Sequence, residues 1–554
     1  AAGSGKTAVL VERVIRLITD KSNAVDIDRL LIVTFTNAAA AEMRYRISKS
    51  LNELIRANPQ DSFYKHQLSL LPNAKISTID AFCTSLVKEH FYELSINQDF
   101  STFDESELQL LEDNVIGEIL DQCFEENNTD FISLFEMFTS PGNEKPVVSA
   151  VKRLLRFIYA QPFPYKWLEK SAELYSPDIP LADSVWFAYI KNEIDYLSSY
   201  ALDLAKENLS LIDFEDEKLN IKFSEVINDD IQEIERIKEN SYRWSDLIRE
   251  RKPSFKRMPS SAKIDKSVSE KIKANRDIYK SILTKDIEGF LVADEDDYQN
   301  DTKALYIHMQ SLIKLVREVD KRLMEEKREL NSYSFSDIEH FAITLLFKLD
   351  ENDNIIRTDL ARELSENYYE ILVDEYQDTN TVQFRLIGIL AKKYRNLCVV
   401  GDDDQSIYRF RGANVGNILN FEEEFPDTKV IKLEQNYRST QHILDAANAV
   451  IQNNKGRKEK ALWTENGQGE PLTFLCFQDA SQEAAYLAKE ILAKVEKGKA
   501  RYQDFAVLYR TNAQSRVFEE KFLLSNVPYK MIGGVNFYAR KEVKDILAYL
   551  KVID

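Results

Sequence analysis

The spacing of apolar and polar residues predicts α/β structure towards both ends of the chain and helices between them. An amphipathic pattern over residues 8–19 predicts a helix, an apolar run at 30–35 predicts a buried strand, and 38–54 predicts a second helix. Residues 104–330 are rich in Glu, Lys and Leu, with mostly helical spacing. Alternating strands and helices return over 335–378, and such alternation is typical of an α/β sheet.

The same pattern predicts the domains. We expect a first α/β domain in two parts, 1–103 and 331–427, separated by a helical insertion over 104–330. Residues 428–554 are expected to form the first, incomplete part of a second sheet domain, with strands at 430–433, 472–477, 505–509 and 529–532. The predicted fold class is therefore α/β.

Composition and charge limit the classes of function. The 554-residue chain is too long for one core, so roughly three to four domains are expected. A net charge of −19 does not exclude nucleic acid, because binding depends on local charge. The basic stretch 243–276, which includes Trp244 and Phe255, could hold duplex phosphate or form a solvated helix face. The acidic run 294–301 predicts a mobile loop.

Metal centres and membrane segments find no support in the sequence. The four cysteines lie far apart without a Cys-x-x-Cys pair, which favours reduced thiols in a cytoplasmic protein. The five histidines show no metal-ligand spacing. No apolar run is long enough to span a bilayer.

Two segments far apart in the chain predict one ATP site. Residues 3–7 read Gly-Ser-Gly-Lys-Thr, the end of a phosphate-binding loop that we expect to begin before residue 1. In such a loop backbone N–H groups cradle phosphates, Lys6 supplies a charge and Thr7 a hydroxyl for Mg²⁺. Residues 371–378 form an apolar run that ends in two carboxylates, Asp374 to hold Mg²⁺ and Glu375 to polarise an attacking water.

Two further segments are candidates for contact with nucleotide or DNA. In Thr-Phe-Thr-Asn at 34–37, an exposed Phe35 could stack on a base, or the segment could be a buried Phe and a helix cap. After a predicted strand at 396–400, Gln405 could orient water or touch the terminal phosphate. Residues 408–411 interleave aromatic and cationic side chains, as in single-strand contacts, although an ordinary turn with a surface ion pair would look the same.

A third segment closes the first strand of the predicted second sheet. Arg438, presented to a nucleotide on the first domain, could stabilise charge in phosphoryl transfer. Tyr437 has a flat face suited to adenine. A surface ion pair and a packed tyrosine are the alternative.

Taken together, these segments resemble the superfamily 1 DNA helicases of the UvrD/PcrA/Rep type. The matching stretches are 2–7, 33–37, 40–43, 373–380, 401–408, 433–439 and 509–515. The part up to about residue 378 most resembles the AddA component of helicase–nucleases, on the stretches 36–43, 67–71, 76–78 and 254–257. Asp80 stands where many relatives have His, and Phe410 where PcrA-like members have Trp. The family's last two motifs and the AddA nuclease domain have no counterpart in this sequence.

The resemblance implies two RecA-like parallel-sheet domains, the first with a large helical insertion, and a 3′→5′ ATP-dependent DNA helicase or single-strand translocase of repair or recombination. It implies ATP and Mg²⁺ as cofactors, single-stranded DNA and single-/double-strand junctions as partners, and leaves open a nuclease partner protein. The ATPase site that it implies comprises Gly3, Ser4, Gly5, Lys6, Thr7, Asp374, Glu375, Gln405, Tyr437 and Arg438. The implied single-strand track comprises Thr34, Phe35, Asn37, Thr78, Tyr408, Phe410 and Arg411.

The residues themselves leave two other functions open. One is an ATP-responsive DNA-binding module without unwinding activity. The other is a phosphate-loop protein unrelated to nucleic acid, in which the aromatic residues near 35 and 408–411 serve packing alone. Strong, salt-sensitive binding of DNA would argue against the second.

Overall fold

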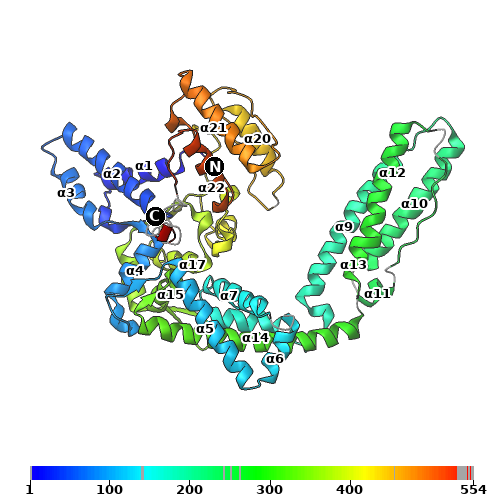
Figure 1. Cartoon of the computed structure of the whole chain (residues 1–554), viewed down its shortest axis with the longest axis horizontal. Helices are drawn as coiled ribbons and strands as arrows, with labels where there is room; N and C mark the ends of the chain where they lie inside the picture. Colours follow the sequence, from blue (N-terminus) through cyan, green and yellow to red (C-terminus); the bar gives the residue numbers. More distant parts are fainter. Residues whose placement is uncertain are drawn as a thin grey trace. The chain divides into compact units, whose positions relative to one another are not determined.

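The computed structural model of the chain describes residues 3–138, 143–240, 244–249, 252–260, 264–292, 294–352, 354–454, 456–532, 546 and 549–550. Contacts divide the chain into two units. The first comprises Ala1–Ser439 and Asn448–Glu465, and the second comprises Thr440–Ala447 and Asn466–Asp554. Figure 1 shows their helices and strands.

A parallel four-stranded sheet organises the first unit. In order across the sheet, its strands are β2 (Lys75–Thr78), β1 (Leu30–Thr34), β7 (Glu370–Val373) and β8 (Leu397–Val399). All three pairings are parallel, so the carboxyl ends of the strands lie at one edge of the sheet. β1 is buried along its whole length, as its continuous apolar run predicts. The α/β fold class is thus confirmed for this unit.

Helices cover both faces of this sheet. Successive residues of a strand point to opposite faces, so Leu31 and Val33 enter one core and Leu30 and Ile32 the other. The first core includes α4 (Ile79–Glu89), α15 (Phe335–Leu346), α16 (Asp359–Asn367), α17 (Thr381–Leu390) and α19 (Phe421–Glu424). The second includes α1 (Lys6–Thr19), α2 (Asn37–Ala57) and α3 (Ser62–Leu70).

The predicted insertion is helical and has two cores. One is built from α5 (Glu105–Glu125), α6 (Thr129–Phe138), α7 (Lys145–Tyr159), α8 (Pro164–Glu173) and α14 (Glu295–Glu329). The other is built from α9 (Val185–Ser210), α10 (Glu217–Glu239), α11 (Trp244–Arg249), α12 (Lys266–Ser281) and α13 (Glu288–Phe290).

Short ladders flank the insertion and the segment after it. β3 (Ser101–Thr102) and β4 (Ser332–Tyr333) pair in parallel and so bring the two ends of the insertion together. β5 (Phe347–Leu349) and β6 (Ile355–Arg357) form an antiparallel hairpin. The long insertion is therefore compatible with a sheet whose strands come from both sides of it.

The acidic run 294–301 is a helix start, and the predicted loop is wrong. The Asp294 side chain caps α14 by accepting a hydrogen bond from the Asp297 N–H over 2.9 Å. Glu295, Asp296 and Asp297 occupy the first turn, where negative charge is favourable beside the positive end of the helix dipole. The acidic residues that indicate a mobile loop by composition therefore stabilise a helix by position.

The predicted strands of the second unit are also not observed. Its described helices are α21 (Ala480–Glu496), α22 (Ser515–Leu524) and the start of α20 (Gln441–Ile451), with a small core that includes Ile491 and Phe522. The stretches 430–433, 472–477, 505–509 and 529–532 form no β-ladder in the described residues. Phe474 and Leu508 are more than 90% exposed. Strand-favouring residues alone do not make a sheet, because each strand needs a neighbour's N–H and C=O groups.

Two expectations from composition concern the whole chain. All four cysteines lie in described residues, and none of them forms a disulfide. Among the helices that the structure describes, none combines the length and hydropathy of a membrane span.

We predict that Asp294→Ala weakens the first turn of α14. The cap donates nothing to the core, so the loss should be local and about 1 kcal/mol in the free energy of opening. Hydrogen exchange of the amides at 295–299 measures it. Asp301→Ala, farther along the same helix and away from the cap, should leave this exchange unchanged; equal effects from both substitutions would contradict the cap.

Candidate active site and nucleic-acid interface

The first turn of α1 lies against the loop that follows β7. Thr7 Oγ1 donates a hydrogen bond to Asp374 Oδ2 over 2.8 Å, and Lys6 Nζ lies 3.5 Å from Glu375 Oε2. Lys6 is only 8% exposed, so its charge is held within the protein. The structure therefore brings together the two segments that the sequence separates most widely.

The turn before α1 is built for close approach to an anion. Gly3 and Gly5 have φ values of +64° and +78°, in the left-handed region that favours glycine. Ser4, between them, is buried. The N–H groups at the start of this 14-residue helix are oriented as in phosphate-binding helix N-termini.

The two carboxylates are placed by the sheet. The Asp374 N–H donates to the Val33 carbonyl of β1 over 2.9 Å, so Asp374 continues the strand pairing. Glu375 then turns out of the strand with φ of +49°, a left-handed conformation that costs a non-glycine residue about 1–2 kcal/mol. Strain of this kind is concentrated at functional sites.

The charge balance of this loop fits a divalent cation. Burial, followed by the negative charge of Glu375, raises the pKa of Asp378 to about 6. Burial is also the main cause that raises the pKa of Asp374, against the hydrogen bond from Thr7. Carboxylate and hydroxyl oxygens are the ligands that Mg²⁺ prefers, usually alongside phosphate and water. Thr7 and Asp374 thus fit the predicted Mg²⁺ ligands; the described residues contain no cluster of three or more His, Cys, Asp or Glu ligands.

Gln377 joins this loop to the one after β8, and the sequence patterns did not predict its role. Its Nε2 donates to Glu375 Oε2 over 2.8 Å and to Asp378 Oδ2 over 3.1 Å, while its Oε1 accepts from the Asp402 N–H over 2.8 Å. A Cβ on Gly401 would lie 2.6 Å from Gln377 Oε1, so only glycine fits there. An amide between two acids was the available signal.

Gln405 lies in the 3₁₀ turn Asp403–Gln405, next to the strand edge. Its Nε2 donates to the Asp402 carboxylate, and its own N–H donates to the Asp402 carbonyl over 2.9 Å. The position of Gln405 is therefore set by Asp402.

Residues 436–438 lie against the phosphate loop. The Tyr437 N–H donates to the Gly3 carbonyl over 3.0 Å, and a Cβ on Gly3 would lie 2.6 Å from Asn436 Nδ2 and 3.0 Å from Arg438 Cβ. The Tyr437 ring is exposed, and its hydroxyl donates to Gln435. Arg438 is exposed as well. Both side chains thus border the loop that would hold phosphate.

Three aromatic rings and a guanidinium form a continuous platform. The Phe35 and Tyr408 rings are 4.8 Å apart, and the Tyr408 and Phe410 rings 6.0 Å apart. The Arg411 guanidinium lies 5.7 Å from both the Tyr408 and the Phe410 rings. Phe35 is 40% and Phe410 74% exposed, so the alternative of a buried Phe35 is wrong. In the part of the chain described, Arg411 has no ion pair, unlike the surface-ion-pair alternative.

The remaining predicted track residues shape helix starts. Thr34 differs from the prediction, because it is 2% exposed and its hydroxyl donates to the Thr36 carbonyl. Asn37 is the first residue of α2, which Thr36 caps. Thr78 caps α4 by accepting the Ala81 N–H over 3.2 Å. Because Thr34 and Thr78 are neighbours across the sheet, both helix N-termini lie at the same edge.

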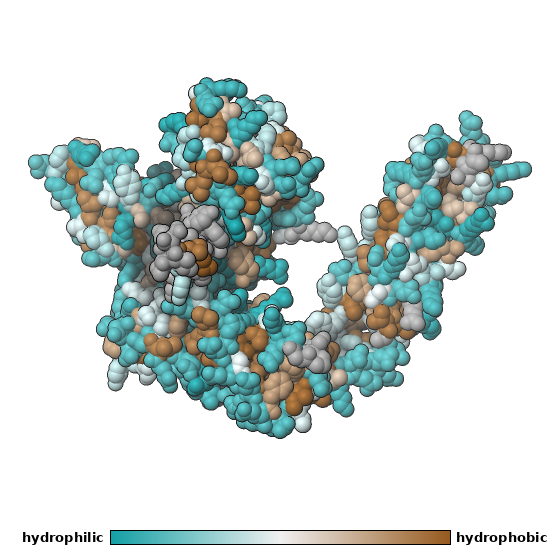
Figure 2. Space-filling model, in the orientation of Figure 1, coloured by the Kyte–Doolittle hydropathy of each residue, from teal (hydrophilic) through white to brown (hydrophobic). Residues whose placement is uncertain are grey.

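The basic stretch 243–276 is largely paired within the insertion. Arg243 and parts of 250–263 lie outside the described residues. Among the rest, Arg276 forms a buried pair with Asp230, and Lys256 and Lys271 pair with acids on neighbouring helices. Trp244 is 7% exposed and packs in the core. The visible surface of this part is mixed, mostly hydrophilic with scattered apolar residues (Figure 2). The duplex-binding hypothesis for this stretch thus loses most of its charge.

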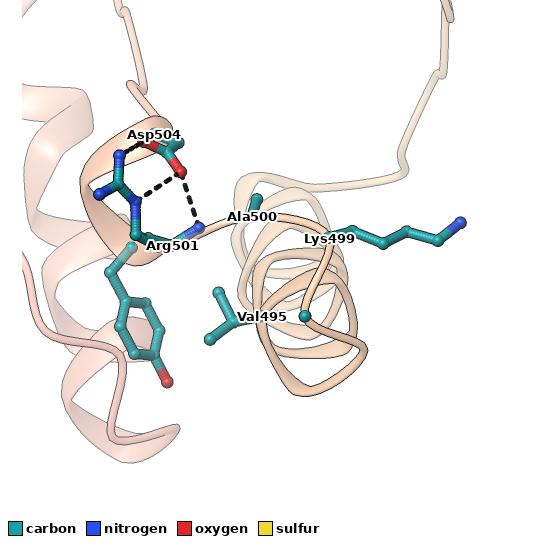
Figure 3. Close-up of a pocket in the computed structure, with 7 residues that line it drawn as sticks. Val495, Lys499, Ala500, Arg501 and Asp504 are labelled. Carbon is teal, nitrogen blue, oxygen red and sulfur yellow. Dashed lines mark hydrogen bonds and ion pairs between the residues drawn. The ribbon is translucent and has the colours of Figure 1, made fainter.

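Two hollows are present in the described structure. A groove of about 660 Å³ follows β8 and reaches Lys6, Gly401 and Lys460. A hollow of about 540 Å³ lies in the second unit, at the end of α21. There Arg501 and Asp504 hydrogen-bond to each other, and Lys499 points away (Figure 3). Only the groove is lined by residues of the predicted ATP site.

A buried pair of acids links α4 to α15. Asp80, in the first turn of α4, hydrogen-bonds to the fully buried Glu339 carboxyl. Glu339 also accepts from Asn380 Nδ2 over 3.0 Å and Gln383 Nε2 over 2.6 Å at the start of α17. Burial first, then the negative charge of Asp80, raises the pKa of Glu339 to about 8. One proton shared by the two carboxyls connects the helix at Thr78 with the helix after Glu375.

Comparison with known proteins identifies the class of protein. Residues 1–426 match the UvrD/REP helicase N-terminal domain, and residues 431–554 match the UvrD-like helicase C-terminal domain. The chain therefore belongs to the UvrD-like helicase family, and the resemblance inferred from the sequence is confirmed.

The chain is also similar to AddA proteins, the first of the two components of ATP-dependent helicase/nucleases. The protein of Clostridium acetobutylicum is 34% identical over 478 residues, which cover 81% of this chain and 38% of that protein. The protein of Acetivibrio thermocellus is 30% identical over 647 residues, which cover all of this chain and 51% of that protein. The chain thus spans about a third to a half of the length of the curated relatives it matches.

We predict that Glu339 makes stability fall as pH rises. The folded protein keeps a proton that an unfolded Glu releases near its ordinary pKa of 4.5, so the stabilisation is full below that pH and is lost towards about 8. The thermal midpoint of Glu339→Gln should therefore drop less than that of the wild type between about pH 6 and about pH 9. Glu42→Gln, at an exposed pair with Arg46, is the control and should follow the wild type. A wild-type slope in Glu339→Gln would contradict the shared proton.

Proposed function

We propose that this chain is the motor part of an ATP-dependent DNA helicase acting in DNA repair or recombination, moving 3′→5′ along single-stranded DNA. The observation that carries the proposal is the contact of Thr7 with Asp374 and of Lys6 with Glu375. Membership of the UvrD-like family and similarity to the AddA proteins of helicase/nucleases support it.

The proposed ATP site divides its work among named residues. Thr7 and Asp374 would hold Mg²⁺, which when bound neutralises phosphate charge. Lys6 and the backbone at 3–7 bind phosphate, and Tyr437 offers its exposed ring to the adenine. Glu375, turned out of its strand, is the base that orients the attacking water.

Two residues from outside the phosphate loop complete the proposed site. Gln405 orients water or contacts the terminal phosphate, from a turn that Asp402 fixes. Arg438 stabilises the charge that develops in phosphoryl transfer, from its place beside Gly3. Both are exposed or half-buried rather than packed in a core.

The proposed single-strand interface is the platform of Phe35, Tyr408, Phe410 and Arg411. Aromatic faces bind bases of any sequence by stacking, and the guanidinium adds a cation near the backbone. Asn37 and Thr78, at two helix N-termini on the same sheet edge, are placed to contact phosphate. Tyr408 lies three residues after Gln405, so the ATP site and the platform share one loop.

The wider organisation remains a proposal. We assign residues 1–103 and 331–427 to the first RecA-like domain, 104–330 to its insertion and 428–554 to a second, incomplete RecA-like domain. The relatives' name suggests a helicase–nuclease in which this chain meets single-/double-strand junctions beside a nuclease partner protein, in the cytoplasm. The second unit, which forms no ladder in its described residues, favours one other candidate: an ATP-responsive DNA-binding module without unwinding. ATP hydrolysis stimulated by single-stranded DNA separates the two.

We predict that Lys6→Ala abolishes DNA-stimulated ATP hydrolysis and leaves single-strand affinity mostly intact. Lys6 is the one cation beside Glu375 in the described contacts of this loop, whereas the aromatic platform does not include it. Steady-state hydrolysis and fluorescence anisotropy with an oligonucleotide measure the two properties. Lys21→Ala, at an exposed pair with Asp61, should change neither. Normal turnover in Lys6→Ala would rule out the assigned site.

We predict that Phe410→Ala weakens single-strand binding by about 1–3 kcal/mol, the usual worth of one stacked base. The ring is 74% exposed, so its loss should hardly affect folding. Phe474→Ala removes another highly exposed ring, from the second unit, and serves as the control. Equal affinities of the two variants would show that the platform is not the binding surface.

A further inference from the structure

A short segment of the chain, residues 457–464, holds the turn that carries Gln405. Arg457 donates two hydrogen bonds to the Asp404 carboxylate, over 2.8 and 2.6 Å. Lys460 Nζ forms ion pairs with three successive carboxylates, those of Asp402 at 2.8 Å, Asp404 at 3.1 Å and Asp403. We call residues 457–464 the strap.

The other end of the strap reaches the phosphate loop through Asn436. The Asn436 N–H donates to the Trp463 carbonyl over 2.8 Å, and Thr464 Oγ1 donates to the Asn436 carbonyl over 2.7 Å. A Cβ on Gly3 would lie 2.6 Å from Asn436 Nδ2. The strap therefore touches both the turn of Gln405 and the residues beside the phosphate loop.

The ion pairs at the first end are shielded from water. The side chains of Lys460 and Asp402 are 13% and 3% exposed. Burial works to raise the pKa of Asp402, but hydrogen bonds from Lys460 and Gln405 outweigh it and hold that pKa below its usual value. Removing one partner of a shielded pair leaves the other charge uncompensated, so these contacts are hard to break singly.

Three adjacent carboxylates repel one another unless a cation lies among them. In this turn that cation is Lys460, and Gln405 in its turn donates to Asp402. Lys460 is not among the residues assigned to touch ATP. Its effect on Gln405 therefore runs through Asp402.

We propose that Lys460 is a positioning residue for ATP hydrolysis, and that the strap keeps the Gln405 turn and the phosphate-loop contact of Asn436 in one arrangement. The inference rests on the proposed function, because it assumes that Gln405 acts on the attacking water or the terminal phosphate. It adds a residue that no comparison of motifs assigns.

Lys460→Met tests the proposal in the full chain with Mg-ATP and single-stranded DNA. A misplaced Gln405 should lower kcat by about 10- to 100-fold, as small displacements of a catalytic group do, with KM for ATP within about twofold. Lys460→Arg keeps the cation and should recover most of kcat. Lys494→Met, which breaks an exposed pair with Glu490 on α21, is the matched control and should behave as the wild type.

Hydrogen exchange gives a readout that does not depend on activity. Lys460→Met should speed exchange over 402–408 and leave α2 unchanged. Should Lys460→Met fail to fold, Arg457→Asp and the exchanged pair Asp404→Arg with Arg457→Asp replace it, and the exchanged pair should recover what the single variant loses.

Wild-type kcat and wild-type exchange in Lys460→Met would overturn the proposal. So would a loss of kcat that neither Lys460→Arg nor the exchanged pair recovers, because that pattern indicates general instability. Absence of DNA-stimulated hydrolysis in the wild type would instead contradict the proposed function, and the exchange experiment would still decide whether the strap holds the turn.

Discussion

The parallel pairing of β1 with β7 is the constraint on which the site depends. It joins Val33 to Val373, residues on opposite sides of the helical insertion, and carries the Asp374 N–H to the Val33 carbonyl. A shift of one residue in this register would turn the strand's side chains to the opposite face of the sheet. Since the entropy of closing a long loop grows only with the logarithm of its length, the large insertion costs the pairing little. Thr7 can then meet Asp374 as a consequence of the sheet.

Beyond the strands, the site is held by polar contacts between loops. Glu375 takes a strained conformation beside other acids, which isolated loops would relax. Gln377 ties it to the loop after β8, and Asn380 ties the following helix to Glu339 and so to α4. The predicted ATP site and the aromatic platform at Tyr408 are therefore parts of one network rather than separate surfaces. A change at the carboxylates has a short, hydrogen-bonded route to the platform.

The sequence predicted what is local and missed what is tertiary. The strands at 30–35 and 396–400 and the phosphate loop were predictable, because apolar runs and glycine spacing act within a few residues. Gln377 and Lys460 were not, because their roles arise only when loops far apart in the chain meet. The acidic run at 294–301 misled because its composition, which suggests disorder, is also that of a well-capped helix start.

The distribution of charge bears on how an acidic chain could bind DNA. In the basic stretch of the insertion, Arg276 and its neighbours are neutralised by acids on adjacent helices. Among the described residues, Arg409 and Arg411 on the platform have no such partners, and they lie beside Tyr408 and Phe410. With few free cations to release counterions, affinity there would rest more on stacking than on phosphate contacts. A surface of that kind suits a motor, because stacking holds bases of any sequence and lets the strand advance without reading it.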